Sequence, residues 1–368
     1  MYSVMNIGIY TIHATNNFGA LLQSYATAKF LNSHGHHAEI VNLYTINDEK
    51  HVCYVNSWTS PKGFVLNLMR LALPSVRRKL TNYQKFRQML PLSIRFFSAS
   101  SLRETPPEYD LHLVGSDQVW NTERELSTAA IYFLDFLVHG EHKASYASSF
   151  GNVEAANRYV SEIKGWLSEY QSVSVREVDA VSFLREKCEV DAKLVLDPTF
   201  LLSAEEWSDI SGEKLLIPGK YVLYYGFDKT QMGQQIIDTV RREYNMPVIG
   251  ISVSLTSPYR FDRFYQQAAP LECLNLIRNA EMVLTSSFHG AALSVNFRKD
   301  FIVIRHGSRM SRLESMLDLF GIKDRIVSNV DDTQQILSSS RHIDYSLCES
   351  FIDSAVNDSK QWLLNVCK

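Results

Sequence analysis

The chain has 368 residues, of which 45% are hydrophobic, so it can bury a large core and is long enough for two domains. Its formal net charge of −3 gives no global argument for a nucleic-acid partner. The five cysteines are scattered, without CxxC or Cys/His ligand spacing, which predicts free thiols in a reducing cytosol and no metal site. No basic region precedes the first apolar residues, and no run reaches the roughly 18 to 20 apolar residues that span a bilayer, so neither a secretion signal nor a membrane span is expected.

The chain opens with a β-α-β pattern. Strand, polar loop, helix and second strand are expected at residues 6–11, 13–20, 21–33 and 38–43. Such units close right-handed onto a parallel sheet, so the loop with Asn17 and Gly19 lies at the carboxyl edge of the first strand. That loop lacks the GxGxxG fingerprint, so it gives no support to dinucleotide binding.

A basic segment follows. From Lys50 to Arg103 there are ten Lys or Arg residues and no Asp or Glu. An apolar stretch at 64–74 precedes Arg77, Arg78 and Lys79, a combination that can lie on an anionic membrane surface. The alternative interpretation is a helical insertion that packs on the domain and exposes a basic face.

Regular alternation of strands and helices resumes near residue 109. Short strands are expected at 111–114, 143–148, 173–175 and 194–196, and a helix follows the third of them to about residue 187. Polar turns leave several of these strands, including one that carries Asp117 and one at Asp197-Pro198-Thr199. Carboxyl ends of parallel strands meet at one sheet edge, so these turns are expected to share a cleft.

A linker at about 202–219 separates a second α/β unit from the first. In it we expect strands at 221–225, 248–251, 282–284 and 301–304, and helices at 231–244, 270–279 and 311–319. The predicted domains are 1–205, with the basic insertion near 50–103, and 206–345. Residues 346–368 are expected to form a helix that packs back on the first domain.

His289 is the leading candidate for chemistry. It follows a short buried strand, beside Ser286, Ser287 and Gly290, where a helix N-terminus presents unpaired N–H groups. Three arginines come after the next strand, and arginine forks bind carboxylate and phosphate: Arg305, Arg309 and Arg312. The pattern predicts a polyanionic substrate.

A helix N-terminus disfavours the imidazolium form of histidine, whereas a bound phosphate favours it. A histidine at such a place could therefore gain a proton when the anion arrives and act as a general acid. No Ser-His-Asp, HExxH or Walker pattern competes with it, but the spacing alone does not identify the reaction.

Six ordered motifs resemble those of the polysaccharide pyruvyl transferase family. They span roughly residues 6 to 325 and read Asn17-Phe-Gly-Ala-Leu-Leu-Gln23, Gly115-Ser-Asp-Gln-Val-Trp-Asn121, Ser174-Val-Arg-Glu177, Leu196-Asp-Pro-Thr199, Thr285-Ser-Ser-Phe-His-Gly-Ala291 and Ser311-Arg-Leu313. The resemblance implies two Rossmann-like domains facing a cleft, as in glycosyltransferase B. It also implies transfer of pyruvate from phosphoenolpyruvate to two hydroxyls of a sugar, forming a cyclic ketal without a cofactor.

The resemblance also implies roles for individual residues. His289 would be the general acid. The donor would be bound by Arg176 together with Ser286, Ser287, Gly290, Arg305, Arg309 and Arg312. The acceptor would meet Asn17, Gly19, Gln23, Asp117, Gln118, Trp120 and Asn121, with Trp120 as a stacking platform or, equally, as a core residue. Several family members have an arginine two residues before the histidine, where this chain has Ser287.

Family acceptors are often lipid-linked saccharides, which would explain a basic segment, residues 62–95, that holds a cytoplasmic protein at the inner membrane face. Two other functions stay open at this point: a nucleotide-sugar glycosyltransferase of the same architecture, and a non-catalytic saccharide-binding relative.

Overall fold

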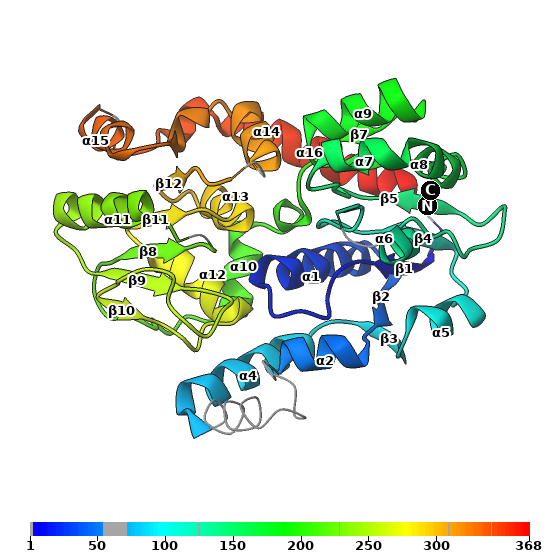
Figure 1. The fold of residues 1–368 in the computed structure, drawn as a ribbon, viewed down its shortest axis with the longest axis horizontal. Coiled ribbons are helices and arrows are strands. Elements are labelled where there is room, and N and C mark those ends of the chain that lie inside the picture. Colours follow the sequence, from blue (N-terminus) through cyan, green and yellow to red (C-terminus); the bar gives the residue numbers. More distant parts are fainter. Residues whose placement is uncertain (1–2, 54–71, 124–125, 228, 308–309, 340) are drawn as a thin grey trace.

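The computed structural model describes residues 3–53, 72–123, 126–227, 229–307, 310–339 and 341–368. Two parallel sheets, one from each half of the chain, lie side by side with helices packed around them (Figure 1). Each sheet belongs to a Rossmann-like α/β domain. This is the two-domain architecture expected from the alternation of strands and helices.

The first sheet has the strand order β3-β2-β1-β4-β5. Its strands are β1 (Asn6–Tyr10), β2 (His37–Leu43), β3 (Leu92–Phe96), β4 (Leu111–Val114) and β5 (Lys143–Ser145). Isolated bridges next to β5 continue the pairing to a small sheet of β6 (Ser174–Val175) and β7 (Lys193–Leu194). The ends of β4 and β7 therefore open at the same edge.

The second sheet has the order β10-β9-β8-β11-β12-β13. Its strands are β8 (Val222–Tyr225), β9 (Val248–Ile251), β10 (Arg263–Phe264), β11 (Met282–Thr285), β12 (Phe301–Ile304) and β13 (Ile326–Val327). The four longest, β8, β9, β11 and β12, are buried along their whole length, because helices cover both faces of a parallel sheet.

Helices connect the strands. In the first half they are α1 (Phe18–Ser33), α2 (Ile46–Val52), α4 (Pro74–Arg87), α5 (Ala99–Glu104), α6 (Leu126–Tyr132), α7 (Val153–Ala156), α8 (Val160–Leu167) and α9 (Val178–Cys188). The others are α10 (Ala204–Ser211), α11 (Gln231–Tyr244), α12 (Pro270–Asn279), α13 (Phe288–Asn296), α14 (Ser311–Leu319), α15 (Val330–Ser339) and α16 (Glu349–Val366). Within the described residues, none of these helices is long and apolar enough to cross a bilayer.

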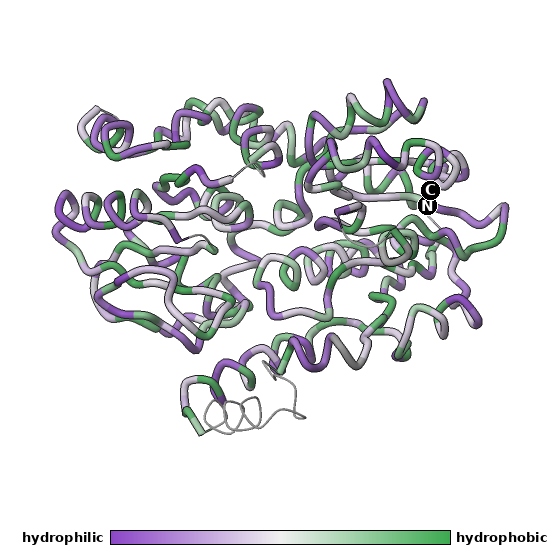
Figure 2. Tube along the Cα trace, viewed as in Figure 1, coloured by the Kyte–Doolittle hydropathy of each residue, from purple (hydrophilic) through white to green (hydrophobic). Residues whose placement is uncertain are grey.

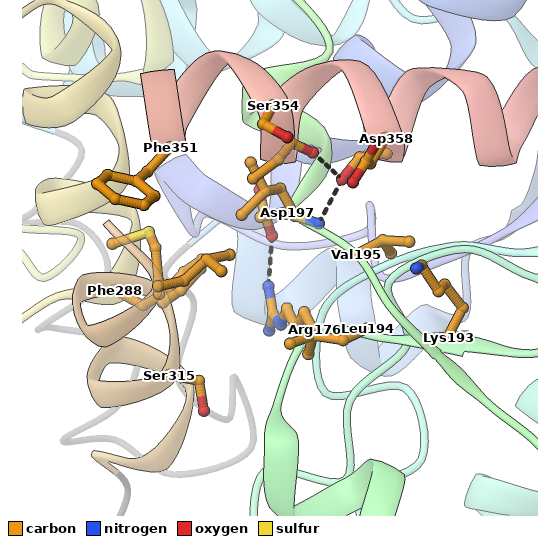
Figure 3. Close-up of a pocket in the computed structure, with 15 residues that line it drawn as sticks. Arg176, Lys193, Leu194, Val195, Asp197, Phe288, Ser315, Phe351, Ser354 and Asp358 are labelled. Atoms are coloured by element: carbon orange, nitrogen blue, oxygen red, sulfur yellow. Dashed lines mark hydrogen bonds and ion pairs between the residues drawn. The ribbon is translucent and has the colours of Figure 1, made fainter. Parts of the chain in front are cut away.

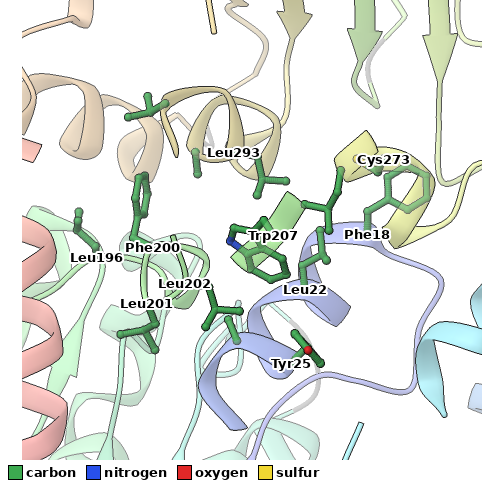
Figure 4. Close-up of a cluster of buried hydrophobic side chains, with 14 of the residues drawn as sticks. Phe18, Leu22, Tyr25, Leu196, Phe200, Leu201, Leu202, Trp207, Cys273 and Leu293 are labelled. Carbon is green, nitrogen blue, oxygen red and sulfur yellow. The ribbon is translucent and has the colours of Figure 1, made fainter. Parts of the chain in front are cut away.

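An apolar core joins the two halves of the molecule. Figure 4 shows Phe18 and Leu22 of α1 beside Cys273 of α12, with Trp207 of α10 and Leu293 of α13 adjacent. The hydropathy tube shows the same pattern, with hydrophobic segments inside both sheets and mixed ones on outer helices (Figure 2). The domains therefore meet through a hydrophobic interface, which is the ordinary source of stability between packed layers.

Helix α16 returns from the second half of the chain to the first. Ser359 on this helix accepts a hydrogen bond from the backbone N–H of Leu196 (2.9 Å), and Trp362 lies against Tyr146 with ring centroids 6.1 Å apart. The helix thus packs behind the turn that follows β7.

The basic segment is built differently from the sequence-based expectation. It contains β3, the edge strand of the first sheet, so it is not purely a helical insertion. The prediction that Lys79 contacts a membrane is wrong, because Lys79 is fully buried and donates to the Ser252 and Ser254 carbonyls of the second domain. Most of the apolar stretch at 64–74, with Lys62 and Arg70, lies outside the described residues.

Candidate active site

Polar turns from the carboxyl ends of both sheets enclose a cavity of about 270 Å³. The first domain contributes Asn17, Asp117 and Gln118, and the second contributes Ser286, Ser287, Phe288, His289, His306 and Arg312. Residues predicted for the site in each of the two domains therefore line the same cavity.

His289 lies in the first turn of α13 and is 7% exposed. Ser287 caps this helix, and its hydroxyl accepts from the Gly290 N–H (3.4 Å). Thr285 fixes the turn, because its hydroxyl accepts from the Ser287 N–H (3.0 Å) and donates to the Tyr225 carbonyl (2.6 Å). The helix N-terminus is therefore rigid where it meets the cavity.

Gly19 of α1 lies directly against the His289 ring. A Cβ atom at position 19 would stand 2.0 Å from Nδ1 of His289, a distance that no side chain tolerates. Asn17 keeps the chain in this place by capping α1, since its side chain accepts from the Gly19 and Ala20 N–H groups (3.0 and 3.3 Å). The first domain thus positions the histidine of the second through a residue without a side chain.

Asp197 is the acidic partner of His289. Its carboxylate lies 3.6 Å from Nε2 of His289 and also accepts from Arg176 (2.5 Å) and from the Thr199 N–H (3.0 Å). Burial opposes ionisation of Asp197, yet His289 and Arg176 outweigh it and hold the pKa of the carboxyl well below its ordinary range. Asp197 is therefore a permanent anion that can stabilise a protonated His289.

Arg176 is buried between two carboxylates. Besides its bond to Asp197, its second terminal nitrogen lies 3.4 Å from Asp117. Burial alone would lower the pKa of Arg176, but the two carboxylates raise it above its ordinary value. Each of its terminal nitrogens faces a carboxylate, and Arg176 lines the second cavity described below and not the one with His289. The structure therefore shows Arg176 holding Asp197 and Asp117 in place.

Arg312, at the start of α14, is the cation that does line the cavity. Burial and the neighbouring Arg176 lower its pKa to about 10, so it stays charged at neutral pH. With the Gln118 amide oriented oxygen toward it, Gln118 accepts from both terminal nitrogens of Arg312 (3.2 and 2.7 Å). Both arginines lie near the Phe288 ring. The Cζ atom of Arg176 is 4.9 Å from the ring centroid, and that of Arg312 is 5.9 Å from it.

A second cavity, of about 290 Å³, lies next to the first, between β7, α14 and α16. Figure 3 shows Arg176 joined to Asp197 at its centre, with Phe288 and Phe351 at one side and Asp358 on α16. Phe288 lines both cavities. Phe288 therefore lies between the two cavities, and the Arg176–Asp197 ion pair lines the second one.

Several predicted acceptor residues do not reach the cavity. Trp120 is fully buried, stacks on Phe133 and donates to the Tyr132 carbonyl (2.8 Å), so of its two predicted roles the structure supports the core residue and not the stacking platform. Gln23 is buried and donates to Thr11 (2.8 Å) and to a backbone carbonyl of its own helix.

Asn121 is also buried, behind Gln118, where it accepts from the Glu123 N–H (2.9 Å). Gly19 packs against His289 and does not line the cavity.

The predicted donor set is also narrower. Arg305 is 42% exposed in its side chain and paired with Glu314 (2.7 Å), outside the cavity lining. Gly290 packs against Thr285, where a Cβ would stand 2.2 Å from the hydroxyl, so this position requires a residue without a side chain. Arg309 lies outside the described residues.

Three residues were missed as site residues: Asp197, Phe288 and His306. Asp197 follows a strand in a motif already noted, so its turn position was the available signal. Phe288 carries no polar group and gave no signal. His306 follows β12, which neighbours β11, so strand adjacency places it near His289, but adjacency is not visible in sequence.

A model of the family described as polysaccharide pyruvyl transferase matches residues 17–308 of this chain. No curated protein sequence matches this chain.

Among solved structures the chain is similar to a UDP-N-acetylglucosamine 2-epimerase from Rickettsia bellii, with 12% identity, a TM-score of 0.55, and coverage of 99% of this chain and 96% of that one. It is also similar to UDP-GlcNAc 2-epimerase from Neisseria meningitidis bound to UDP-GlcNAc, with 10% identity, a TM-score of 0.51 and 98% of each chain covered. A third is an Anabaena protein in complex with UDP and glucose, with 11% identity, a TM-score of 0.51, and 97% and 95% covered. These likenesses show the glycosyltransferase B type of fold.

Proposed function

Because the chain belongs to the polysaccharide pyruvyl transferase family, we propose that it transfers pyruvate from phosphoenolpyruvate to two hydroxyls of a sugar in a surface polysaccharide or its lipid-linked precursor. The observation that carries the proposal is one cavity in which His289 and the cation Arg312 face Asp117 and Asn17 of the other domain.

The donor would bind on the second domain. Its phosphate and carboxylate are anionic, and Arg312 with the N-terminus of α13 offers a guanidinium fork and a positive helix end. Ser287 stands where several family members carry an arginine. Arg312 lines the same cavity as Ser287, so a guanidinium is still available to an anionic donor there.

Nε2 of His289 has no hydrogen-bond partner among the described residues, and Asp197 stands ready as its counter-ion. The protonated ring would give its proton to the methylene carbon of the enol. An acceptor hydroxyl then bonds to the adjacent carbon and loses its proton, phosphate leaves, and the second hydroxyl closes the ring and loses its proton. The products are the ketal and inorganic phosphate.

The acceptor would approach from the first domain. The Asp117 carboxylate lines the cavity and is 15% exposed in its side chain, so it can accept a hydrogen bond from a sugar hydroxyl. Its backbone has φ of 75°, an uncommon conformation for a residue with a side chain. This geometry, held by Arg176, directs a carboxylate toward the donor.

A thermal-shift panel tests the donor. Phosphoenolpyruvate should raise the melting temperature, whereas UDP should not. Stabilisation by UDP alone would overturn the proposal in favour of a nucleotide-sugar transferase, and stabilisation by neither would favour a saccharide-binding role. The reaction itself is checked by mass spectrometry of the surface glycan, which should lose a pyruvate ketal when the gene is deleted.

Contact with an anionic membrane is part of the same proposal, now restricted to the exposed residues of α4. Arg77 and Arg78 are exposed, whereas Lys79 is not. In a flotation assay with anionic liposomes at moderate salt, the wild-type protein should float with the liposomes, and the variant with both arginines changed to Glu should not. Equal flotation of wild type and variant would remove membrane contact from the proposal.

A further inference from the structure

Helix α4 touches both domains, along one face. Lys79, Tyr83 and Arg87 are spaced by four residues, so they lie on the same side of the helix. Figure 1 shows α4 below α1, near the strands of the second sheet. Its exposed residues Arg77 and Arg78 are on other faces, so the helix has a chemically distinct inner side.

One end of this inner face holds the second domain. Lys79 donates to the Ser252 carbonyl (2.5 Å) and the Ser254 carbonyl (3.3 Å), just beyond β9. Asn82 donates to the Gln267 carbonyl (3.1 Å), before α12. The buried Lys79 amine therefore links α4 to two backbone carbonyls of the other domain.

The other end holds the loop at residues 13–17, which we name the Asn17 loop. Arg87 donates to the Thr15 carbonyl (2.7 Å) and to the Asn16 side chain (2.6 Å). Tyr83 donates to the Asn16 carbonyl (2.5 Å). This loop delivers Asn17 to the wall of the cavity and Gly19 to the His289 ring.

A column of rings and cations connects these two ends. Arg87 lies over Tyr83 (5.4 Å), Tyr83 stacks on Phe18 (5.9 Å), and Lys79 lies over Phe18 (5.6 Å). Phe18 in turn contacts Tyr225 at the end of β8 in the second domain (5.3 Å). Phe18 stands between Asn17 and Gly19 in the chain, so a shift of the column moves both.

We infer that Lys79, Tyr83 and Arg87 are positioning residues that hold the Asn17 loop at a fixed distance from the second domain and thereby place Gly19 against His289. The inference rests on the proposed function for its kinetic consequence. The apolar interface of α1, α12 and α13 already joins the domains, so the polar contacts of α4 set the position of one loop and add little to overall stability.

Arg87→Met and Tyr83→Phe test the loop end. Both should lower kcat for phosphate release, by about tenfold to a hundredfold for Arg87→Met, because small displacements near the reacting atoms are costly. KM for phosphoenolpyruvate should stay within about twofold, because the donor binds on the other domain. Arg87→Lys should recover part of kcat, and Gln84→Met, at an exposed position of the same helix, is the matched control.

Lys79→Met and Asn82→Ala test transmission from the other end of the helix, since the side chains of both residues donate to carbonyls of the second domain. Both should increase hydrogen–deuterium exchange in a peptide covering residues 11–20, as should Arg87→Met. If exchange rises only for Arg87→Met, or if kcat falls only in proportion to the folded fraction, the inference is overturned. Absence of any wild-type phosphate release would instead count against the proposed function, while the exchange result would still decide the role of α4.

Discussion

The two sheet edges that face each other across the cavity carry opposite chemistry. The strand ends of the first domain carry carboxylates, Asp117 after β4 and Asp197 after β7, whereas those of the second domain are followed by hydroxyls, His289 and Arg312. An anionic donor fits the second edge, and a hydroxyl nucleophile fits the first. The exception is the contact between Asp197 of the first domain and His289 of the second. Because of this contact, the environment of His289 depends on both domains.

The largest effect is expected for His289→Gln. The substitution keeps a polar side chain but removes the proton donor, so phosphate release should fall by about 10² to 10⁴. Phosphoenolpyruvate should still raise the melting temperature of the variant, because Arg312 is intact. His139→Gln is the control, since that histidine is 90% exposed in its side chain. Turnover at a tenth of wild type would exclude His289 as the acid.

Asp197→Asn comes next and breaks the contact that crosses the two edges. Removing one partner of a buried ion pair should reduce the free energy of unfolding by about 3 kcal/mol at pH 7, measured by urea denaturation. Because the folded-state pKa of Asp197 is depressed, its contribution is present above the ordinary value of 3.8 and is lost as the pH falls below it. The variant should therefore lose less stability than wild type on acidification, and Asp353→Asn, an exposed site, should match wild type.

Arg312→Gln sharpens the assignment of the donor to the second edge. Loss of a charge-assisted contact worth about 1.5 to 3 kcal/mol should raise KM for phosphoenolpyruvate by about tenfold to a hundredfold. Arg305→Gln provides the comparison, since Arg305 is paired with Glu314 outside the cavity. Equal KM values for the two variants would place the donor elsewhere.

The last prediction concerns Lys79, whose amine donates to carbonyls just beyond β9 and does not line the cavity. Burial lowers its pKa to about 7 from an ordinary 10.5, so the unfolded chain binds the proton more tightly than the folded one between these values. Stability should therefore rise with pH across that window, by at most about 1.4 kcal/mol per pH unit. Urea denaturation of wild type and Lys79→Met between pH 6.5 and 9.5 should show a difference that changes with pH, whereas the exposed Lys85→Met should show none.

Periodicity predicted the second domain closely. The helices at 231–244, 270–279 and 311–319 begin and end at the expected residues, because each is amphipathic and bounded by a cap, a turn or a proline. The edge strand β3 was missed, since only pairing with β2 makes that stretch extended and its charge and apolar content resemble a surface helix. Local pattern determines elements with their own cap and apolar face, but not those that depend on a neighbour.

The site was predictable to a different depth. His289, Arg312 and Asp117 follow from strand ends and polar turns, and the structure brings them together. The exclusion of Trp120 and Gln23 could not be predicted, because a motif does not say which of its side chains faces the core. The burial of Lys79 could not be predicted for the same reason, because the sequence of a helix with several basic residues does not show which of them faces the protein.

The contact between Gly19 and His289 makes the surroundings of the histidine depend on docking of the two domains. The ring of His289 is held on one side by a glycine from the first domain and on the other by the carboxylate of Asp197, also from the first domain. A second domain folded alone would carry the histidine but neither support. In a newly made chain, His289 therefore gains both supports only when the two halves dock.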